Sequence, residues 1–89
     1  MPVVDIEIIN KLGLHARAAA KLVSVSSRFS STISITKGAK KVDAKSIMSV
    51  MMLAASKGTT LSIETDGDDQ SAALAAITLL INNKFDEDE

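Results

Sequence analysis

The stretch VDIEIINKLGLHARAAAKLVSVSSRF, residues 4–29, changes the period of its apolar side chains partway along its length. From residue 4 to residue 8, valine and isoleucine alternate with acidic residues, which is the pattern of a half-buried strand. From Ala16 onward the sequence is rich in alanine and its apolar side chains recur at helical spacing. The face expected to be buried comprises Ala19, Leu22, Val23 and Ser26. The stretch therefore predicts a strand, a short loop over 10–15 and a helix.

Three more alternating segments and a short helical one follow. Strands are expected at 32–36, 41–43 and 61–64, with a turn that contains Gly38 between the first two. A short helix is expected at 47–54, with Ser46 at its N-cap position. Lys57 and Gly58 suit its C-terminal end, because a cation and a glycine are favoured after a last helical turn. The residues of this helix expected to face the sheet are Val50, Leu53 and Ala54.

The chain closes with a helix and an acidic tail. An acidic turn at 66–69 introduces the helix, whose expected buried stripe comprises Ala73, Leu74, Ile77, Leu80 and Ile81. Residues 86–89 are all acidic and are expected to form a solvated tail. The order of elements is then βαββαβα, which is an α+β fold. Four strands with one apolar face need one covering layer, so we expect an antiparallel sheet with all three helices on one side.

Composition narrows the classes of function. The 89 residues are expected to form a single domain, 1–89. A net charge of −1 and two aromatic residues disfavour nucleic-acid binding, including an RNA-binding βα module. Cysteine is absent, which excludes disulfides and thiolate metal sites. The N-terminus does not have the form of a signal peptide, and no apolar run could span a bilayer. A cytoplasmic protein without membrane insertion is therefore expected.

His15 is the only histidine, and it lies where the glycine-containing loop meets the first helix, two residues before Arg17. A helix N-terminus offers unpaired N–H groups and a partial positive charge, which together suit a phosphate or another anion. Arg17 adds a planar, permanently charged donor. A neutral imidazole placed there could attack a phosphoryl group, and the amides and Arg17 could stabilise the product.

Simpler roles for His15 stay open on the sequence alone. A histidine near a helix start can be a cap or a partly buried polar residue, and position by itself does not decide between these roles and the functional one. A metal site is disfavoured because neither a second histidine nor a cysteine is available to complete it.

The short helix at 47–54 is apolar nearly all round, although a helix on a sheet needs only one apolar stripe. Ile47, Met48 and Met51 would then be largely exposed, and exposed apolar patches often mark protein interfaces. The alternative is that loops or the first helix cover them. For Ser46 the default role is N-capping, although a phosphate there would suit the helix dipole.

Two segments together resemble one known family. Residues 11–17, KLGLHAR, followed by the alanine-rich helix, are similar to the active-site motif of the histidine-containing phosphocarrier (HPr) family of the bacterial phosphoenolpyruvate-dependent phosphotransferase system. Residues 45–51, KSIMSVM, resemble the regulatory-serine motif of that family. The two motifs lie at the family's spacing, and the resemblance covers essentially the whole chain.

The resemblance implies an open-faced β-sandwich and a carrier of phosphoryl groups that is not an independent enzyme, has no cofactor or metal, and is a monomer. Enzyme I, itself phosphorylated by phosphoenolpyruvate, would pass the phosphoryl group to Nδ1 of His15, and His15 would pass it to an enzyme IIA domain. Arg17 matches the family's active-site arginine. Ser46 matches the serine modified by an ATP-dependent HPr kinase/phosphorylase in many bacteria. The residues that match the partner-docking surface are Ala16, Ala20, Ile47, Met48 and Met51.

The chain departs from the family pattern at a few positions. Ala18 stands where the family usually has proline, and Leu12 stands where many relatives are polar. Ser24 and Ser27 replace lysines that some relatives present to acidic partners, so a less basic partner surface is expected.

Two other functions remain as alternatives. One is a nitrogen-related or purely regulatory carrier with the same chemistry and no sugar permease downstream. The other is a small acylphosphatase-like hydrolase that would use Arg17 as its phosphate cradle. Such a hydrolase needs a group that positions water, and Asn10 is the only nearby candidate.

Overall fold

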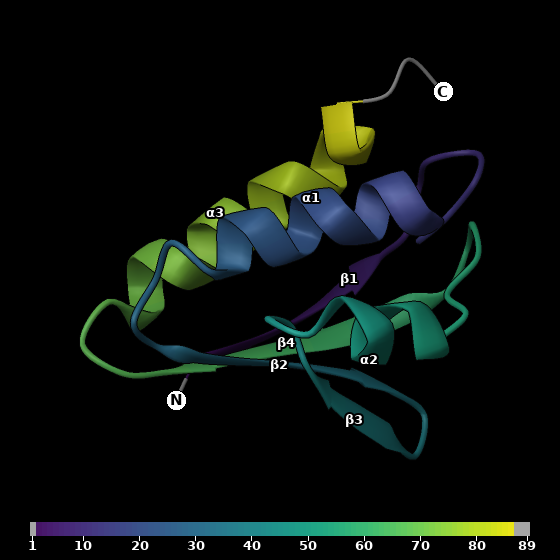
Figure 1. The fold of residues 1–89 in the computed structure, drawn as a ribbon. Coiled ribbons are helices and arrows are strands. Elements are labelled where there is room, and N and C mark those ends of the chain that lie inside the picture. The colour runs from purple at the N-terminus through teal and green to yellow at the C-terminus, as the bar shows by residue number, and fades with distance from the viewer. Residues whose placement is uncertain (1, 87–89) are drawn as a thin grey trace.

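The computed structural model describes residues 2–86, which form four strands and three helices in the predicted order βαββαβα (Figure 1). The strands are β1 (Val3–Glu7), β2 (Thr32–Lys37), β3 (Lys40–Asp43) and β4 (Thr60–Asp66). The helices are α1 (Ala16–Ser26), α2 (Ile47–Met52) and α3 (Gln70–Asn82), and a short 3-10 turn, η1 (Lys84–Asp86), follows α3.

The sheet has the strand order β1-β4-β2-β3, and every pair of neighbours is antiparallel. The three helices cover one of its faces, α1 and α3 running side by side and α2 lying over the β2–β3 half (Figure 1). The other face is left open. The predicted open-faced arrangement is therefore confirmed.

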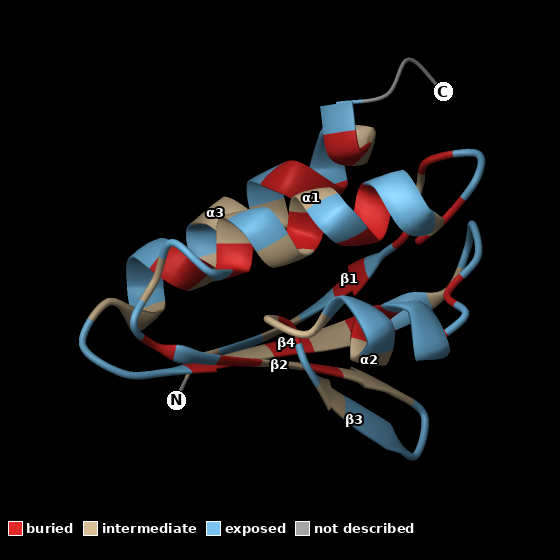
Figure 2. Ribbon diagram, viewed as in Figure 1, coloured by how far each residue is buried: buried red, intermediate tan, exposed pale blue. Residues whose placement is uncertain are grey.

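The core lies between the sheet and the helices, and alternate residues of β2 and β4 are buried (Figure 2). The fully buried apolar side chains of the strands are those of Ile33, Ile35, Leu61 and Ile63. They form one cluster with buried residues of the helices, among them Ala19, Leu22, Ala73, Ile77 and Ile81. Apart from Phe85, the buried core residues are aliphatic. Their period-2 and period-3.6 spacing is the basis of the strand and helix predictions.

The short helix differs from its prediction at the C-terminal end. α2 stops at Met52, and Ala54, predicted to face the sheet, is instead exposed with a left-handed backbone (φ +52°). Val50 and Leu53 are buried as predicted. Lys57 and Gly58 do not close the helix, because the chain has already turned away at Ala54. They belong to a separate turn, where the Gly58 N–H donates to the Ile8 carbonyl at 2.8 Å.

Residues 84–86 form η1, which packs against α3 and α1. Phe85 in η1 is completely buried, and Lys21 of α1 donates from Nζ to its carbonyl at 2.9 Å. Asp86 lies 3.8 Å from the same ammonium. Asp86 is exposed, as expected of a solvated tail, although it belongs to η1, and residues 87–89 lie outside the described part of the chain.

Asp69, expected to supply an acidic start to the last helix, has another role. Its side chain makes no capping hydrogen bond to α3. It accepts hydrogen bonds from the Ser31 hydroxyl and from the backbone N–H groups of Ser30 and Ser31, the latter two at 2.9 Å. These bonds, that of the Ser31 hydroxyl foremost, lower the pKa of Asp69 to about 2. Asp69 thus joins the α1–β2 loop to the start of α3.

Candidate functional site

His15 occupies the N-cap position of α1. Its backbone is extended (φ −75°, ψ 177°), and its carbonyl accepts the first helical hydrogen bond, from the Ala19 N–H, at 2.8 Å. The imidazole is half-buried and does not cap the helix, so the capping role considered for it is not observed. The N–H groups of the first helical turn have no acceptor within a helix. They can therefore serve an anion held next to the imidazole.

The loop before His15 is held by its backbone. The Leu14 N–H donates to the Ala55 carbonyl at 2.8 Å, which ties the loop to the segment after α2. Gly13 has φ +66° and lies so close to that segment that a Cβ atom would be 2.5 Å from the Ala55 carbonyl oxygen. No residue other than glycine fits there without a shift of the backbone.

Asn10 completes the same loop from inside the protein. It is completely buried, and its Nδ2 donates to the Gly13 carbonyl at 2.8 Å. A buried amide bound to the backbone is badly placed to position water, which counts against the hydrolase alternative. Sequence reasoning considered Asn10 only as a catalytic candidate. Its place three residues before a glycine in a turn was the signal for a structural role.

Arg17 and the two alanines of the predicted docking surface lie on the outside of α1. Arg17, Ala16 and Ala20 are all exposed, whereas Ala18 is completely buried. An exposed guanidinium in the first turn adds positive charge at the helix end already described. α1 has no acidic residue in that turn to oppose an anion.

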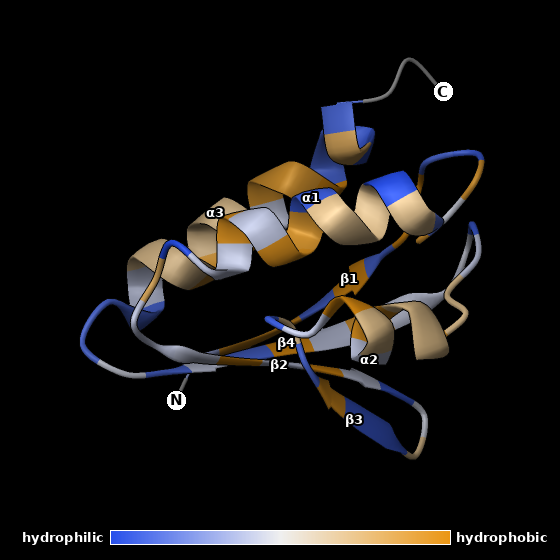
Figure 3. Cartoon of the chain, in the orientation of Figure 1, coloured by the Kyte–Doolittle hydropathy of each residue, from blue (hydrophilic) through white to orange (hydrophobic). Residues whose placement is uncertain are grey.

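The apolar surface of α2 is exposed as predicted. The exposed fractions are 41% for Ile47, 72% for Met48 and 45% for Met51, and the helix is apolar on nearly every side (Figure 3). α2 packs against α1, and its C-terminal end lies at the same end of the molecule as the start of α1 (Figure 1). We call Ile47, Met48 and Met51 the α2 patch. The structure thus brings this patch and the His15 loop to one end of one face.

On α2 and in the loop before His15, two further apolar side chains are exposed that were not predicted as surface. They are Met52, 66% exposed on α2, and Leu12, 67% exposed in the loop before His15. The exposure of Met52 could have been predicted from the sequence, because a helix that is apolar all round must expose apolar residues on more than one side. Ser24 on α1 and Ser27 at the C-cap of this helix are exposed as well, so the substitution of lysine by serine noted there concerns surface positions.

The C-terminal end of α2 is capped by lysines from the β2–β3 hairpin. Lys37 donates from Nζ to the carbonyls of Leu53 (2.9 Å) and Ala54 (3.3 Å), and Lys40 reaches the carbonyl of Met52 at 3.4 Å. The two ammonium groups take the position that was predicted for Lys57. They satisfy carbonyls at the negative end of the helix dipole and hold the α2 patch over the hairpin.

Ser46 is the N-cap of α2, as predicted. Its Oγ accepts a hydrogen bond from the Ser49 N–H at 3.4 Å, and the residue is half-buried. The long distance indicates a weak cap. The hydroxyl lies next to Ile47, the first residue of the α2 patch.

The described residues limit other kinds of site. No helix within residues 2–86 combines the length and the apolar character needed to cross a membrane. The same residues contain no group of three histidine, aspartate or glutamate side chains that could hold a metal ion.

Comparisons with known proteins agree on one family. Residues 4–83 match the family model described as PTS HPr component phosphorylation site. The phosphocarrier protein HPr of Pseudomonas aeruginosa is 54% identical over 90 residues, with all of both chains covered. A crystal structure of HPr from Thermoanaerobacter tengcongensis superposes with a TM-score of 0.96 at 48% identity, again over all of both chains.

A structure described as an HPr dimer, from Thermoanaerobacter tengcongensis, also matches. Its TM-score is 0.79 at 49% identity, with 98% of this chain and all of that chain covered. A family model that spans most of the sequence and a relative of this identity along its full length are sufficient to assign the family. The chain belongs to the HPr phosphocarrier family of the phosphotransferase system.

Proposed function

We propose that this protein accepts a phosphoryl group from enzyme I on Nδ1 of His15 and passes it to enzyme IIA domains. The observation that carries the proposal is the position of His15 at the N-cap of an eleven-residue helix, where its imidazole does not cap the helix. In the first transfer the bond between phosphorus and the enzyme I donor breaks as the bond to Nδ1 forms, and in the second the bond to Nδ1 breaks as the bond to the enzyme IIA acceptor forms. The first-turn amides of α1 and the Arg17 guanidinium stabilise the phosphoryl oxygens.

The protein acts as a carrier in the cytoplasm and not as an independent enzyme. The imidazole of His15 is half-buried, so a partner's own active site can reach it. A monomer suits this role, since both the donor and the acceptor must reach the same histidine. Sugar transport is the expected output, and a nitrogen-related or regulatory branch would use the same chemistry.

The direct test is incubation with enzyme I and phosphoenolpyruvate, followed by mass mapping of acid-labile phosphate. We expect one phosphoryl group on His15 and none on a folded His15→Ala variant. Acid-labile phosphate on that variant would disprove the assignment. Turnover of acyl phosphates without a phosphoprotein intermediate would favour the hydrolase alternative.

Partner docking is proposed to use the α2 patch together with Ala16 and Ala20. Met48→Glu should weaken binding to enzyme I and to an enzyme IIA domain by about tenfold or more, because a carboxylate replaces an apolar contact at the centre of the surface. Stability should change by no more than about 0.5 kcal/mol, since the side chain is exposed. Titration calorimetry and thermal melts measure the two effects.

The matched control is Leu79→Glu, which makes the same change at another exposed apolar side chain, on α3. It should bind both partners as the parent does. Equal binding by Met48→Glu and the parent would contradict the docking proposal, and loss of folding would show that Met48 supports the core.

Ser46 is proposed as a regulatory site for an HPr kinase/phosphorylase. A phosphate there would place negative charge beside Ile47, at the edge of the patch that partners cover. Ser46→Asp is therefore expected to stay folded and to accept phosphate from enzyme I slowly. Phosphorylation of His15 in that variant at the parent's rate would leave Ser46 with its capping role only.

A further inference from the structure

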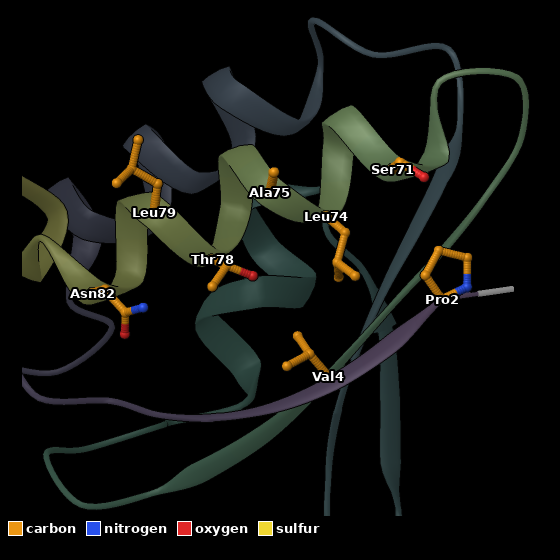
Figure 4. Close-up of a pocket in the computed structure, with 8 residues that line it drawn as sticks. All are labelled: Pro2, Val4, Ser71, Leu74, Ala75, Thr78, Leu79 and Asn82. Atoms are coloured by element: carbon orange, nitrogen blue, oxygen red, sulfur yellow. The ribbon is translucent and has the colours of Figure 1, made fainter.

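A second surface lies far from the α2 patch, where α3 crosses the edge of the sheet at β1. A groove of about 480 Å³ opens there, and Figure 4 shows its lining. Val4 of β1 and Leu74 of α3 point toward one another across it, and Thr78 points into the same space (Figure 4). None of the residues that line this groove is charged. The volume is within the range of about 300–1,000 Å³ that is usual for binding pockets.

The backbone next to this groove is free to pair with another strand. β1 is an edge strand, because its partner in the sheet is β4 on one side. The Pro2 carbonyl accepts from the Thr65 N–H at 3.1 Å, and the Ile8 N–H donates to the Thr59 carbonyl at 2.9 Å. The backbone N–H and C=O groups of the even-numbered residues in this segment therefore point toward β4. In an antiparallel ladder the backbone groups of the intervening residues point to the opposite side of the strand. The N–H and C=O groups of Val3, Asp5 and Glu7 therefore point out from the edge.

The open face of the sheet beside this edge is acidic. Asp5 and Glu7 are exposed there, and within residues 2–86 neither forms an ion pair. Their partners in register on β4 are Ser62 and Thr60, which carry no charge. A strand added at β1 would thus meet an apolar groove on its helix side and two carboxylates on its open side.

We propose that the β1 edge binds an extended segment of a partner protein in which apolar and basic side chains alternate. Side chains of a strand point to opposite faces in turn, so the apolar ones would enter the groove beside Val4 and Leu74. The basic ones would lie opposite Asp5 and Glu7, where pairs of opposite charge stabilise neighbouring strands. Backbone pairing with residues 3–7 supplies the remaining hydrogen bonds.

A second copy of this chain fits this edge poorly. Pairing of β1 with β1 would bring Asp5 and Glu7 of one copy against the same carboxylates of the other, and like charges directly opposite are destabilising. Charged side chains on an edge strand are also a common protection against self-pairing. Charge complementarity therefore selects a basic partner.

The test uses the full chain labelled with ¹⁵N and three peptides of about eight residues. The first peptide alternates lysine and valine, the second has the same residues in two blocks, and the third alternates glutamate and valine. The first should shift the amides of residues 3–7 and of α3 near Thr78, leave those of α2 unchanged, and protect the amides of Val3, Asp5 and Glu7 from hydrogen exchange. Equal shifts from the block peptide would reduce the effect to charge attraction and overturn the proposal.

Two pairs of variants locate the binding. Thr78→Glu places a charge in the groove and should weaken binding by about tenfold or more, whereas Ala72→Glu, an exposed α3 position outside the groove, should not. Glu7→Pro removes an outward N–H and a charge, so it should bind more weakly than Glu7→Gln, which removes the charge alone.

Each variant is first checked for a native ¹⁵N spectrum, and Ala75→Glu replaces Thr78→Glu if that variant does not fold, because Ala75 also lines the groove. Equal affinity of the groove variant and Ala72→Glu would overturn the proposal. So would shifts of the β1 amides that depend on protein concentration without peptide, because they would identify a second copy as the occupant. Neither result depends on phosphotransfer at His15.

Discussion

Gly13 is the residue whose backbone most directly positions the loop before His15. Glycine is favoured at this position for two reasons: the backbone is left-handed, and the segment after α2 leaves no room for a Cβ atom. Only the first reason applies to Gly38. Gly38 has φ +58°, but a Cβ atom there would meet nothing within 4 Å. The two glycines therefore separate the cost of backbone strain from the cost of a clash.

Gly38→Ala should reduce the free energy of unfolding by about 1–2 kcal/mol, the cost of a left-handed alanine. Gly13→Ala should cost about 2–5 kcal/mol, because overpacking against Ala55 and Ser56 adds to the same strain. It should also slow phosphorylation of His15, whereas Gly38→Ala should not. Urea unfolding and a phosphotransfer time course measure the two effects. Equal stability of the variants would show that the segment after α2 moves aside at no cost.

The carboxylate of Asp69, which binds the α1–β2 loop, makes the stability of the protein depend on pH. Its pKa is lowered from 3.8 to about 2 in the folded protein, so the unfolded state binds the proton more readily. The stabilisation is therefore fully present above about pH 4 and is lost as the pH falls through about 2.

Asp69→Asn should melt at a lower temperature than the parent at pH 6, and the difference should shrink between about pH 4 and pH 2. Asp68→Asn is the control, because Asp68 is exposed and its side chain forms no hydrogen bond within residues 2–86. Thermal melts over this pH range test the prediction. A difference that stays constant down to pH 2 would show that the carboxylate charge is not what Ser30 and Ser31 stabilise.

At the scale of the elements, α2 depends on contacts from outside itself. A six-residue helix is too short to be stable by propensity, and its N-cap bond is long at 3.4 Å. Val50 and Leu53 anchor it in the core, while Lys37 and Lys40 hold its C-terminal carbonyls. The position of the α2 patch therefore depends on the β2–β3 hairpin.

Lys37→Gln should reduce the free energy of unfolding by about 0.3–2 kcal/mol, because it removes an ammonium from the negative end of a helix. Lys57→Gln, at the position where the sequence predicted the cap, should cost less than about 0.5 kcal/mol. Urea unfolding of the two variants, with hydrogen exchange of the α2 amides, separates the roles. A larger effect at Lys57 would mean that Lys37 does not cap the helix in solution.

For the whole molecule, Phe85 closes the core from the C-terminal end. It is one of two aromatic residues and is completely buried, and Lys21 ties its carbonyl to α1. The other, Phe29, is only half-buried at the end of α1. The turn η1, late in the chain, is thus held against a helix that begins just after the first loop.

Phe85→Ala should cost about 3–5 kcal/mol, the usual effect of removing a buried phenyl ring. Phe29→Ala should cost about 1–2 kcal/mol, because less apolar surface leaves water there on folding. Chemical denaturation of both variants measures the difference. If Phe29→Ala proved the more damaging, the C-terminal turn would not be part of the cooperative unit.

The sequence by itself determined the features that depend on neighbouring residues. Apolar periods of 2 and 3.6 placed the strands and helices, since side chains that share a face are two or about four residues apart. The surplus apolar residues of α2 predicted its exposed surface by the same reasoning. The KLGLHAR and KSIMSVM segments indicated the family because each motif is contiguous in the chain.

Tertiary structure alone decided the features that join distant residues. Lys37 caps α2 from sixteen residues away, Lys21 reaches Phe85 across sixty-four, and Asp69 binds Ser31 across thirty-eight. The groove between β1 and α3 likewise joins the two ends of the chain. An ammonium can donate to any backbone carbonyl, and a carboxylate can accept from any backbone N–H, that folding brings near it. The partner of such a side chain therefore cannot be predicted from a sequence period. That is why Lys57, correct by local rules, was the wrong lysine.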